Sequence, residues 1–249
     1  MDSDADQPKL YRELAGWFHL LTSPEDYDVE ADFYGRLLTE AAENSINTIL
    51  ELGSGGGNNA WHMKAHFDLT LTDLSDEMLA LSKALNPELE HLRGDMRTIR
   101  LDRQFDAVFV HDAVDYMTTE KDLRAAITTA FEHCKPGGAA LFAPDHVSET
   151  FKATTDHGGH DGEDRSLRYL EWDWDPDPAD NTYVVDFAYL LRNESGRTRV
   201  VHDRHICGLF PRATWLKLLS DAGFRARVHS GIEDETAPDI FIGVRPRPD

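Results

Sequence analysis

The chain has 249 residues, of which 41% are apolar and 29% are charged. These values lie near the globular average and exclude collagen-like, coiled-coil and wholly disordered proteins. Asp and Glu number 46 against 25 Lys and Arg, for a formal net charge of −21. Such acidity disfavours nucleic acid as a partner, because an acidic surface repels phosphates.

No apolar run approaches the roughly 20 residues that a membrane span needs. The acidic N-terminus does not follow the pattern of a secretory signal, and Cys134 and Cys207 are the two cysteines. The sequence therefore predicts a cytoplasmic protein with no membrane contact and no disulfide framework. The acidity has two possible explanations. One is adaptation of the source organism, to salt or to a high GC content, and the even spread of the acidic residues along the chain favours it. The other is an electrostatic field that attracts cationic substrates.

The predicted elements begin with helices over 10–21 and 28–42, the second of which has a buried face formed by Val29, Phe33, Leu37, Leu38 and Ala41. Strands then alternate with helices as far as residue 143. The strands are expected at 48–52, 68–72, 90–93, 105–110 and 139–143, and the helices at 59–66, 75–85 and 119–134. This alternation predicts an α/β fold with a parallel, doubly wound sheet.

The pattern changes after the fifth strand, where the polar residues 145–164 predict a loop. Three up-and-down strands are expected at 168–174, 182–192 and 197–209, followed by a helix at 213–222 and strands at 225–231 and 239–244. We therefore expect one domain over 1–249 with a small antiparallel insertion. Its parts are N-terminal helices (1–44), a core (45–145), the loop and insertion (146–209) and a C-terminal helix with two strands (210–249).

A glycine-rich turn, Glu51-Leu52-Gly53-Ser54-Gly55-Gly56-Gly57-Asn58, follows the first strand and precedes a helix. A dinucleotide fingerprint requires glycine at the position of Asn58, so a nicotinamide dehydrogenase is disfavoured. No Lys-Ser or Lys-Thr pair follows, so the turn is not a P-loop. The spacing of Gly53, Gly55 and Gly57 instead brings bare backbone close to a ligand.

Acidic residues stand at the ends of the next two strands. Asp73, 20 residues after Gly53, can accept hydrogen bonds from both hydroxyls of a ribose. Asp95 can accept from an adenine amino group, and Met78 and Met96 offer soft surface to an adenine face. Because open α/β sheets bind ligands at the carboxyl ends of their strands, these positions predict a nucleoside site.

This combination resembles the class I S-adenosylmethionine (SAM) methyltransferases. The matching segments are Glu51 to Gly57, Asp73-Leu74-Ser75-Asp76-Glu77-Met78-Leu79, Gly94-Asp95-Met96-Arg97, Phe105-Asp106-Ala107-Val108 and Lys135-Pro136-Gly137-Gly138. The resemblance covers roughly residues 45–145 and implies a Rossmann-like sheet of seven strands, the last antiparallel, with SAM as cofactor. The cofactor-binding residues that it implies are Glu51, Gly53, Ser54, Gly55, Asn58, Asp73, Leu74, Met78, Asp95, Met96 and His111, the last expected to contact SAM through its backbone.

A looser likeness extends to the C-terminus. Pro144 with Ser148-Glu149-Thr150-Phe151, His205 to Phe210 and Ala222-Gly223-Phe224 are similar to segments of enzymes that N,N-dimethylate nucleotide-linked amino sugars. In that subgroup three antiparallel strands cover the active site. The loop over 152–166, which should touch substrate, departs from the subgroup. Trp172 and Trp174 share one strand face, and we expect them to pack the insertion onto the core rather than stack on substrate.

The reacting side chains are expected where the fourth and fifth strands end. The candidates there are His111, Asp112, Asp115, Tyr116, Asp145 and His146. Tyr116 matches a position at which the subgroup carries His or Tyr near the reacting nitrogen, so it is the candidate base or orienting group. His146 is the candidate for substrate contact, with loop capping as the alternative. Tyr11, Trp17 and Phe18 are expected either to form a lid over SAM or to pack in the core.

Histidine pairs elsewhere do not predict a metal site, and none is expected. His62 and His66 are spaced i, i+4 on a helix but lack the Glu of a His-Glu-x-x-His motif. His202 and His205 lie three apart in a strand, so their side chains point to opposite faces.

The sequence thus predicts a SAM-dependent methyltransferase that acts on a small molecule, as a monomer or homodimer. Methylation of an amine nitrogen is the leading hypothesis, because of the subgroup likeness and, more weakly, the acidic charge. O-methylation of a carboxylate or hydroxyl is one alternative, and a SAM-binding protein without turnover is another.

Overall fold

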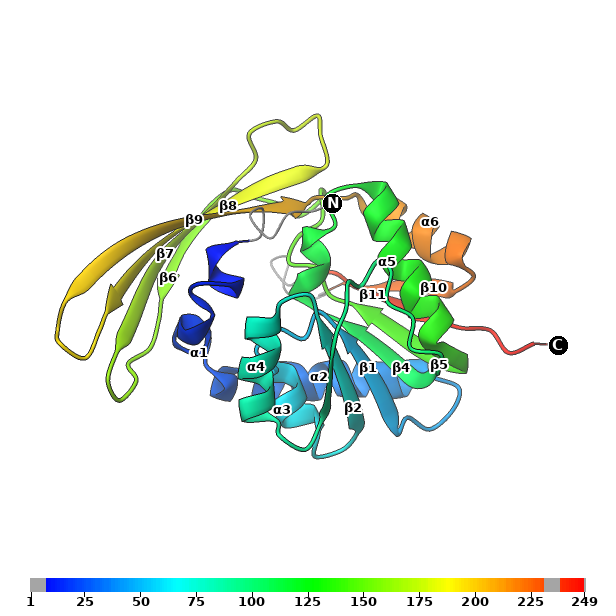
Figure 1. The fold of residues 1–249 in the computed structure, drawn as a ribbon. Helices are drawn as coiled ribbons and strands as arrows, with labels where there is room; N and C mark the ends of the chain where they lie inside the picture. The colour runs from blue at the N-terminus through cyan, green and yellow to red at the C-terminus, as the bar shows by residue number, and fades with distance from the viewer. Residues whose placement is uncertain (1–7, 231–237, 249) are drawn as a thin grey trace.

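The computed structural model describes residues 8–230 and 238–248 and is built around a seven-stranded sheet (Figure 1). The strands are β1 (Thr48–Leu52), β2 (Asp68–Asp73), β3 (Glu90–Arg93), β4 (Phe105–Val110), β5 (Cys134–Phe142), β10 (Arg225–His229) and β11 (Ile240–Val244). Their order is β10-β11-β5-β4-β1-β2-β3, and β11 runs antiparallel to both neighbours. The predicted sheet with an antiparallel last strand is confirmed.

Helices cover both faces of this sheet, because successive side chains of a strand point to opposite faces. The helices are α2 (Asp28–Ala41), α3 (Asn58–Met63), α4 (Asp76–Leu85), α5 (Glu120–His133) and α6 (Arg212–Ala222). In β4, Ala107 and Phe109 belong to the core cluster of α2 and α3. Val108 and Val110 belong to the cluster of α5 and α6. The apolar sequence of β4 follows from this burial on both sides.

The insertion forms a second sheet with four antiparallel strands in the order β6-β7-β8-β9. They are β6 (Thr154–Gly158), β7 (Ser166–Trp174), β8 (Thr182–Arg192) and β9 (Thr198–Gly208). The prediction of a loop throughout 145–164 is therefore wrong at β6. This edge strand is almost entirely exposed and is held by backbone pairing with β7, so its sequence carries no apolar alternation that would reveal it.

The predicted continuous helix over 10–21 is also wrong. Over this range the chain instead forms three short helical segments, η2 (Lys9–Tyr11), η3 (Ala15–Trp17) and α1 (Phe18–Leu21), and η4 (Pro24–Tyr27) follows them. Arg12 leaves the helical conformation, with φ −130° and ψ −103°. The carboxylate of Asp203 accepts the backbone N–H groups of Lys9 and Leu10, which have no acceptor inside a helix that begins there, so this tertiary contact fixes where the segment starts.

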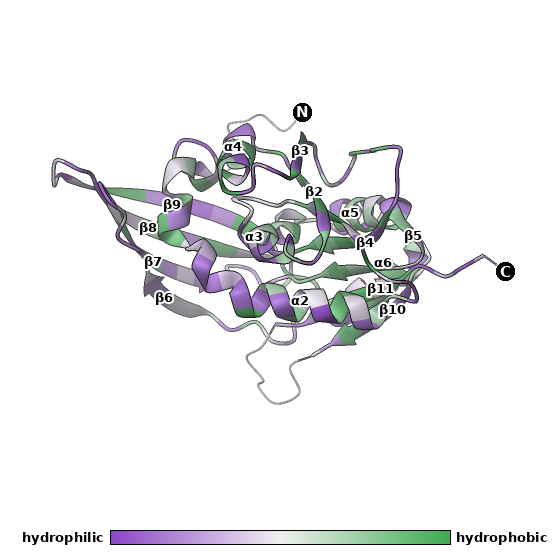
Figure 2. Ribbon diagram, turned by 90° about the horizontal axis from the view of Figure 1, so that it is seen from below, coloured by the Kyte–Doolittle hydropathy of each residue, from purple (hydrophilic) through white to green (hydrophobic). Residues whose placement is uncertain are grey.

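The buried face of α2 differs in part from the prediction. Leu37 and Leu38 are buried as expected, but Val29 is 76% exposed, and Ala31 and Tyr34 are buried instead. Figure 2 shows the resulting alternation of hydrophilic and hydrophobic residues along α2. Among residues 8–230 and 238–248, no helix combines the length and the apolar character that a membrane crossing requires.

Candidate active site

The glycine turn between β1 and α3 has a backbone that only glycine tolerates. Gly53, Gly55 and Gly57 have φ values of 76°, 52° and 79°, in the region that L side chains rarely adopt. A Cβ atom at Gly53 would lie 2.3 Å from Cβ of Ala113, and one at Gly57 would lie 2.3 Å from Oγ of Ser82. The turn therefore presents bare backbone at the carboxyl end of β1, as the sequence predicted.

Asp73, at the end of β2, is fixed beside this turn. Its Oδ2 accepts the N–H of Gly55 and its Oδ1 accepts the N–H of Ser75, each at 2.9 Å. Burial raises the pKa of Asp73, and these backbone donors act in the opposite direction. Because each carboxylate oxygen has a second acceptor position, the side chain retains capacity for two hydroxyl donors.

Three buried polar atoms at the turn have no hydrogen-bond partner among the residues that the structure describes: Oε2 of Glu51, Oγ of Ser54 and Oδ1 of Asn58. Glu51 is 3% exposed, and burial raises the pKa of its carboxyl to about 8. Buried polar atoms normally have partners. Their concentration at one turn fits a polar ligand such as the amino acid part of SAM, so these residues could hold that cofactor.

The N-terminal segment covers the glycine turn. A Cβ atom at Gly56 would lie 2.7 Å from the ring of Phe18, and Nε2 of His19 lies 3.3 Å from the carbonyl oxygen of Gly56. The hydroxyl of Ser75 donates to the carbonyl oxygen of Tyr11 at 2.6 Å. Tyr11 and Phe18 thus lie over the candidate cofactor site, and His19 is a neighbour that the sequence did not single out.

The remaining aromatic candidate of this segment, Trp17, has a different environment. Its ring lies 5.1 Å from the guanidinium of Arg165, and it packs against the core cluster of the insertion. This contact fastens the segment to the second sheet rather than to the glycine turn.

The part of the site predicted to hold adenine is apolar, and its acidic residue, Asp95, already has an ion-pair partner. Met78 and Met96 are 1% and 8% exposed, and a Cβ atom at Gly53 would lie 2.9 Å from Cε of Met96. Asp95 forms an ion pair with Arg97 that includes a 2.6 Å contact between Oδ2 and Nη2. Leu74 is 39% exposed beside Asp73.

His111, which follows β4, forms two contacts with carboxylates. Its Nε2 lies 2.8 Å from Oδ1 of Asp112 and 3.4 Å from Oε1 of Glu30. Burial opposes the charged ring, but these carboxylates raise the pKa of His111 to about 9. The ring is thus held as a cation at neutral pH. Glu30, on α2, was not found from the sequence, since nothing in its local pattern points to β4.

Tyr116 lies in η5 (Asp112–Tyr116) at the junction of the two sheets. Its hydroxyl lies 2.8 Å from that of Tyr11 and 2.8 Å from Nδ1 of His205. His205 is 4% exposed and contacts Asp203. The side chain of His202 is 62% exposed, so the two histidines of β9 do point to opposite faces. Strand alternation would have placed Asp203 and His205 together, but sequence reasoning did not connect them with Tyr116.

His146 follows β5 and packs beneath the second sheet. Its ring lies 5.2 Å from the rings of Phe151 and Tyr183, and its Nε2 lies 3.6 Å from Oδ2 of Asp173. Asp173 is 7% exposed and its Oδ1 has no partner. His146 is therefore held by aromatic and acidic neighbours at the inner face of β7.

Four acidic side chains gather around this inner face: Asp115, Asp145, Glu171 and Asp173. Asp115 accepts the backbone N–H of Asp145 at 2.9 Å, and burial together with Asp145 raises the pKa of Asp115. Burial and neighbouring carboxylates raise the pKa of Asp145 to about 7 and that of Glu171 to about 8. Asp145 is solvent-accessible, so the acidic cluster can be reached from outside the protein.

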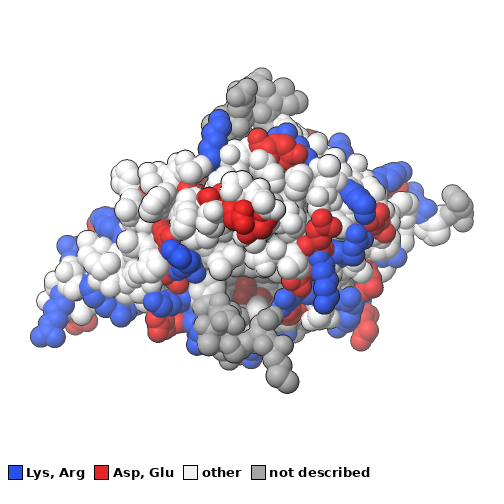
Figure 3. Space-filling view, turned by 90° about the horizontal axis from the view of Figure 1, so that it is seen from above, with Lys and Arg blue, Asp and Glu red and all other residues white. Residues whose placement is uncertain are grey.

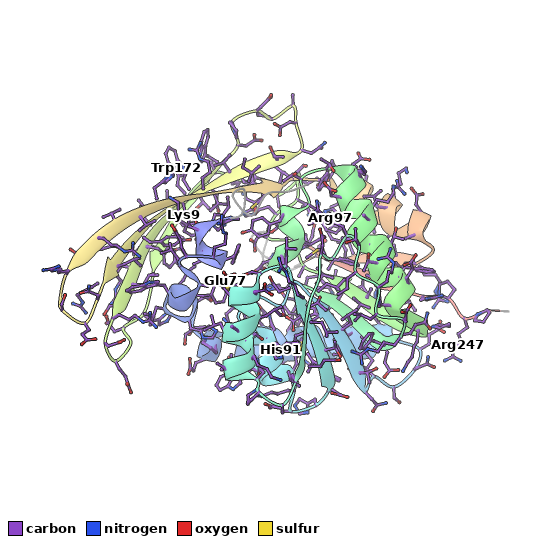
Figure 4. The ribbon with its side chains drawn as sticks, in the orientation of Figure 1. Lys9, Glu77, His91, Arg97, Trp172 and Arg247 are labelled. Carbon is purple, nitrogen blue, oxygen red and sulfur yellow. The ribbon has the colours of Figure 1, made fainter. Side chains whose placement is uncertain are left out.

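Trp172 and Trp174 do not pack the insertion onto the core, so that prediction is wrong. Trp172 is 51% exposed and points away from the rest of the molecule (Figure 4). Trp174 donates from Nε1 to Asp186, which also binds Arg204. Both indoles lie on the outer face of β7, opposite Glu171 and Asp173.

The comparisons with known proteins agree with this fold. Residues 49–138 match the family model described as a methyltransferase domain. A dTDP-3-amino-3,4,6-trideoxy-alpha-D-glucopyranose N,N-dimethyltransferase from Streptomyces venezuelae is 26% identical over 230 residues, which cover 88% of this chain and 92% of that protein.

Two solved structures share the fold. Streptomyces venezuelae DesVI has a TM-score of 0.83 at 24% identity, with 93% of this chain and 98% of that chain covered. SAM-bound CalS10 from Micromonospora echinaspora, an amino pentose methyltransferase, has a TM-score of 0.76 at 22% identity, with coverages of 88% and 91%. The matched segment is a methyltransferase domain, and the fold is the one that these solved methyltransferases share. The chain is a SAM-dependent methyltransferase, and SAM is its cofactor.

Proposed function

We propose that this enzyme methylates the nitrogen of a small amine of the amino-sugar type. The observation that carries the proposal is the acidic cluster (Asp115, Asp145, Glu171, Asp173), which lies between the inner face of β7 and the ends of β4 and β5, where an acceptor would bind. An acidic cleft favours cationic ligands and repels anionic ones. It therefore favours an ammonium and disfavours a carboxylate acceptor.

The charges of the second sheet support the same conclusion. Three charged side chains of this sheet point inward, toward the main sheet: Glu171 and Asp173 from β7 and Asp203 from β9, counted over residues 169–173, 183–189 and 201–207. Arg168 and Arg204 of the same strands lie on the outer side, where they pair with Asp161 and Asp186. The inner face of the second sheet, which would cover the acceptor, is thus acidic, whereas its outer face carries both acidic and basic side chains.

The raised pKa values of the cluster suit an amine. A bound SAM supplies a methyl group already activated on a sulfonium, so the protein must orient the acceptor and free its electron pair. An ammonium must lose a proton first, and a base whose pKa lies near the working pH is suited to take it. Asp145, whose pKa is raised to about 7, is suited to carry that proton onward to solvent once another group has taken it from the ammonium.

The relatives support the amine over the hydroxyl. The Streptomyces venezuelae protein is named as an N,N-dimethyltransferase of a nucleotide-linked amino sugar, and Cypemycin N-terminal methyltransferase from Streptomyces sp is a second relative, 30% identical over 98 residues. The first name describes methylation at nitrogen, and the second describes methylation at an N-terminus. We extend that chemistry to this chain, with Tyr116 and His146 as the residues that contact the acceptor.

The test is a panel of acceptors matched in shape. Purified protein is incubated with SAM and with amino sugars, the corresponding hydroxyl sugars and the corresponding sugar acids. We expect S-adenosylhomocysteine and a methylated product, identified by mass spectrometry, with the amines alone. Turnover of the hydroxyl or acid compounds instead would contradict the proposal. Calorimetric SAM binding without turnover of any acceptor would favour a protein that only binds SAM.

A further inference from the structure

The hydroxyl of Tyr116 belongs to a chain of four side chains that joins η2, η5 and β9. The hydroxyl oxygen of Tyr11 and Nδ1 of His205 each lie 2.8 Å from the hydroxyl oxygen of Tyr116. Nε2 of His205 lies 3.3 Å from Oδ2 of Asp203. His205 and Asp203 are each 4% exposed, so water does not compete for these positions.

Asp203 fixes the direction of the hydrogen bonds. It accepts the N–H of Lys9 at 3.0 Å and that of Leu10 at 2.8 Å. Burial opposes its ionisation, but the contact with His205 and these backbone donors lower the pKa of Asp203. An ionised carboxylate can only accept. A neutral His205 must therefore carry its proton on Nε2, which leaves Nδ1 as an acceptor for the Tyr116 hydroxyl.

This direction leaves the oxygen of Tyr116 with an unused acceptor position. Its own proton is directed at His205, and Tyr11 can donate into one of its two lone pairs. The second lone pair has no donor among residues 8–230 and 238–248, so it can accept from a bound ligand. We propose, on the basis of the amine methylation proposed above, that Asp203 and His205 make Tyr116 the group that accepts the proton of the acceptor ammonium.

The proton transfers balance in one concerted step. The N–H bond of the ammonium breaks, and its proton bonds to the oxygen of Tyr116 as the tyrosine proton passes to Nδ1 of His205. The nitrogen keeps its electron pair, which is then available to the methyl group. The imidazolium is stabilised by the carboxylate of Asp203, as in a hydrolase triad. No tyrosinate forms, in keeping with the burial that raises the pKa of Tyr116.

Asp203 also determines where Tyr11 lies, because it binds the backbone of the two residues that precede Tyr11. One carboxylate thus sets the tautomer of His205 and holds the N-terminal segment in place. The titratable groups that face Tyr116 and His205 are Tyr11 from η2, Tyr189 from β8, and Asp203 and Cys207 from β9. In this scheme His205 and Asp203 are positioning residues behind Tyr116.

His205→Asn is the sharpest test. Oδ1 of asparagine can accept from Tyr116 in place of Nδ1, but it cannot hold the transferred proton. We expect kcat to fall about 100-fold with the KM for the amine unchanged. The loss should shrink as pH rises, because more of the amine is then deprotonated before it binds. His202→Asn is the matched control, since His202 lies on the outer face of the same strand, and it should keep the wild-type kcat and pH profile.

SAM affinity, measured by calorimetry, reports whether each variant is folded. If His205→Asn does not bind SAM, Asp203→Asn replaces it and should show the same pH-dependent loss, because its amide no longer dictates the tautomer of His205. A wild-type kcat in the folded variant, or a loss that is equal at every pH, would overturn the inference. Failure of the wild-type enzyme to methylate any amine would instead refute the proposed function, so the two failures are distinguishable.

Discussion

Glu51 carries a carboxyl group whose buried environment disfavours its ionised form. Its side chain is 3% exposed, Oε2 has no partner, and burial raises the pKa from an ordinary 4.5 to about 8. At neutral pH the carboxyl is therefore mainly protonated in the folded chain. Protein interiors rarely keep such a group unless a ligand uses it, which supports its proposed place in the cofactor site.

The pH dependence of stability should reveal this carboxyl. Between pH 4.5 and about 8 the folded chain holds a proton that the unfolded chain has released, so this group lowers stability as pH rises. Glu51→Gln removes the effect. Without SAM, we expect the variant to match the wild type at pH 4 and to exceed it by a few kcal/mol at pH 9, as measured by urea unfolding. If the free energies of unfolding of the two proteins changed with pH in the same way, the pKa of Glu51 would not be raised in the folded chain.

At the scale of elements, the β1–α3 turn is the part of the cofactor site least able to accept a side chain. Gly57→Ala must adopt a φ of 79° and would place Cβ 2.3 Å from Oγ of Ser82 and 2.5 Å from Nδ2 of Asn86. We expect a loss of more than about 2 kcal/mol of stability and much weaker SAM binding, measured by thermal unfolding and calorimetry.

Gly196→Ala provides the control for that substitution. Gly196 lies in the turn between β8 and β9 with a φ of 75°, but a Cβ atom there meets nothing within 4 Å. The backbone cost alone, about 1 kcal/mol, should remain, and SAM binding should be unchanged. Equal losses of stability and of SAM affinity in the two variants would mean that the close contacts of Gly57 with α4 do not determine the effect of the substitution.

The sequence predicted those elements whose own residues determine them. β1 and β4 are apolar runs bounded by turns, and their bounds match the prediction. β6 and the N-terminal segment were not predicted, because pairing with β7 and the carboxylate of Asp203 determine them, and both partners lie far away in the chain. The same distinction applies to the site: the glycine turn and Asp73 follow from a local motif, whereas Glu30 and His205 reach it only through tertiary folding.

At the scale of the molecule, one apolar cluster joins the parts that the active site needs. Leu10 and Leu14 of the N-terminal segment pack with Tyr183 and Tyr189 of the second sheet, and Tyr116 lies at its border with the core of the main sheet. Acidic and basic side chains are interspersed on the face seen in Figure 3. We propose that the chain folds as one domain.

Unfolding should therefore occur in one cooperative step. Calorimetry should give a single transition whose enthalpy equals the van't Hoff enthalpy. Leu14→Ala, at a side chain that is 1% exposed, should lower the whole transition by the roughly 2–5 kcal/mol of a buried Leu→Ala change. Val200→Ala, on the outer face of β9 with 68% exposure, should leave it in place. If Leu14→Ala instead splits the transition in two, the second sheet and the SAM-binding sheet are separate folding units, and the N-terminal segment is only a connection between them.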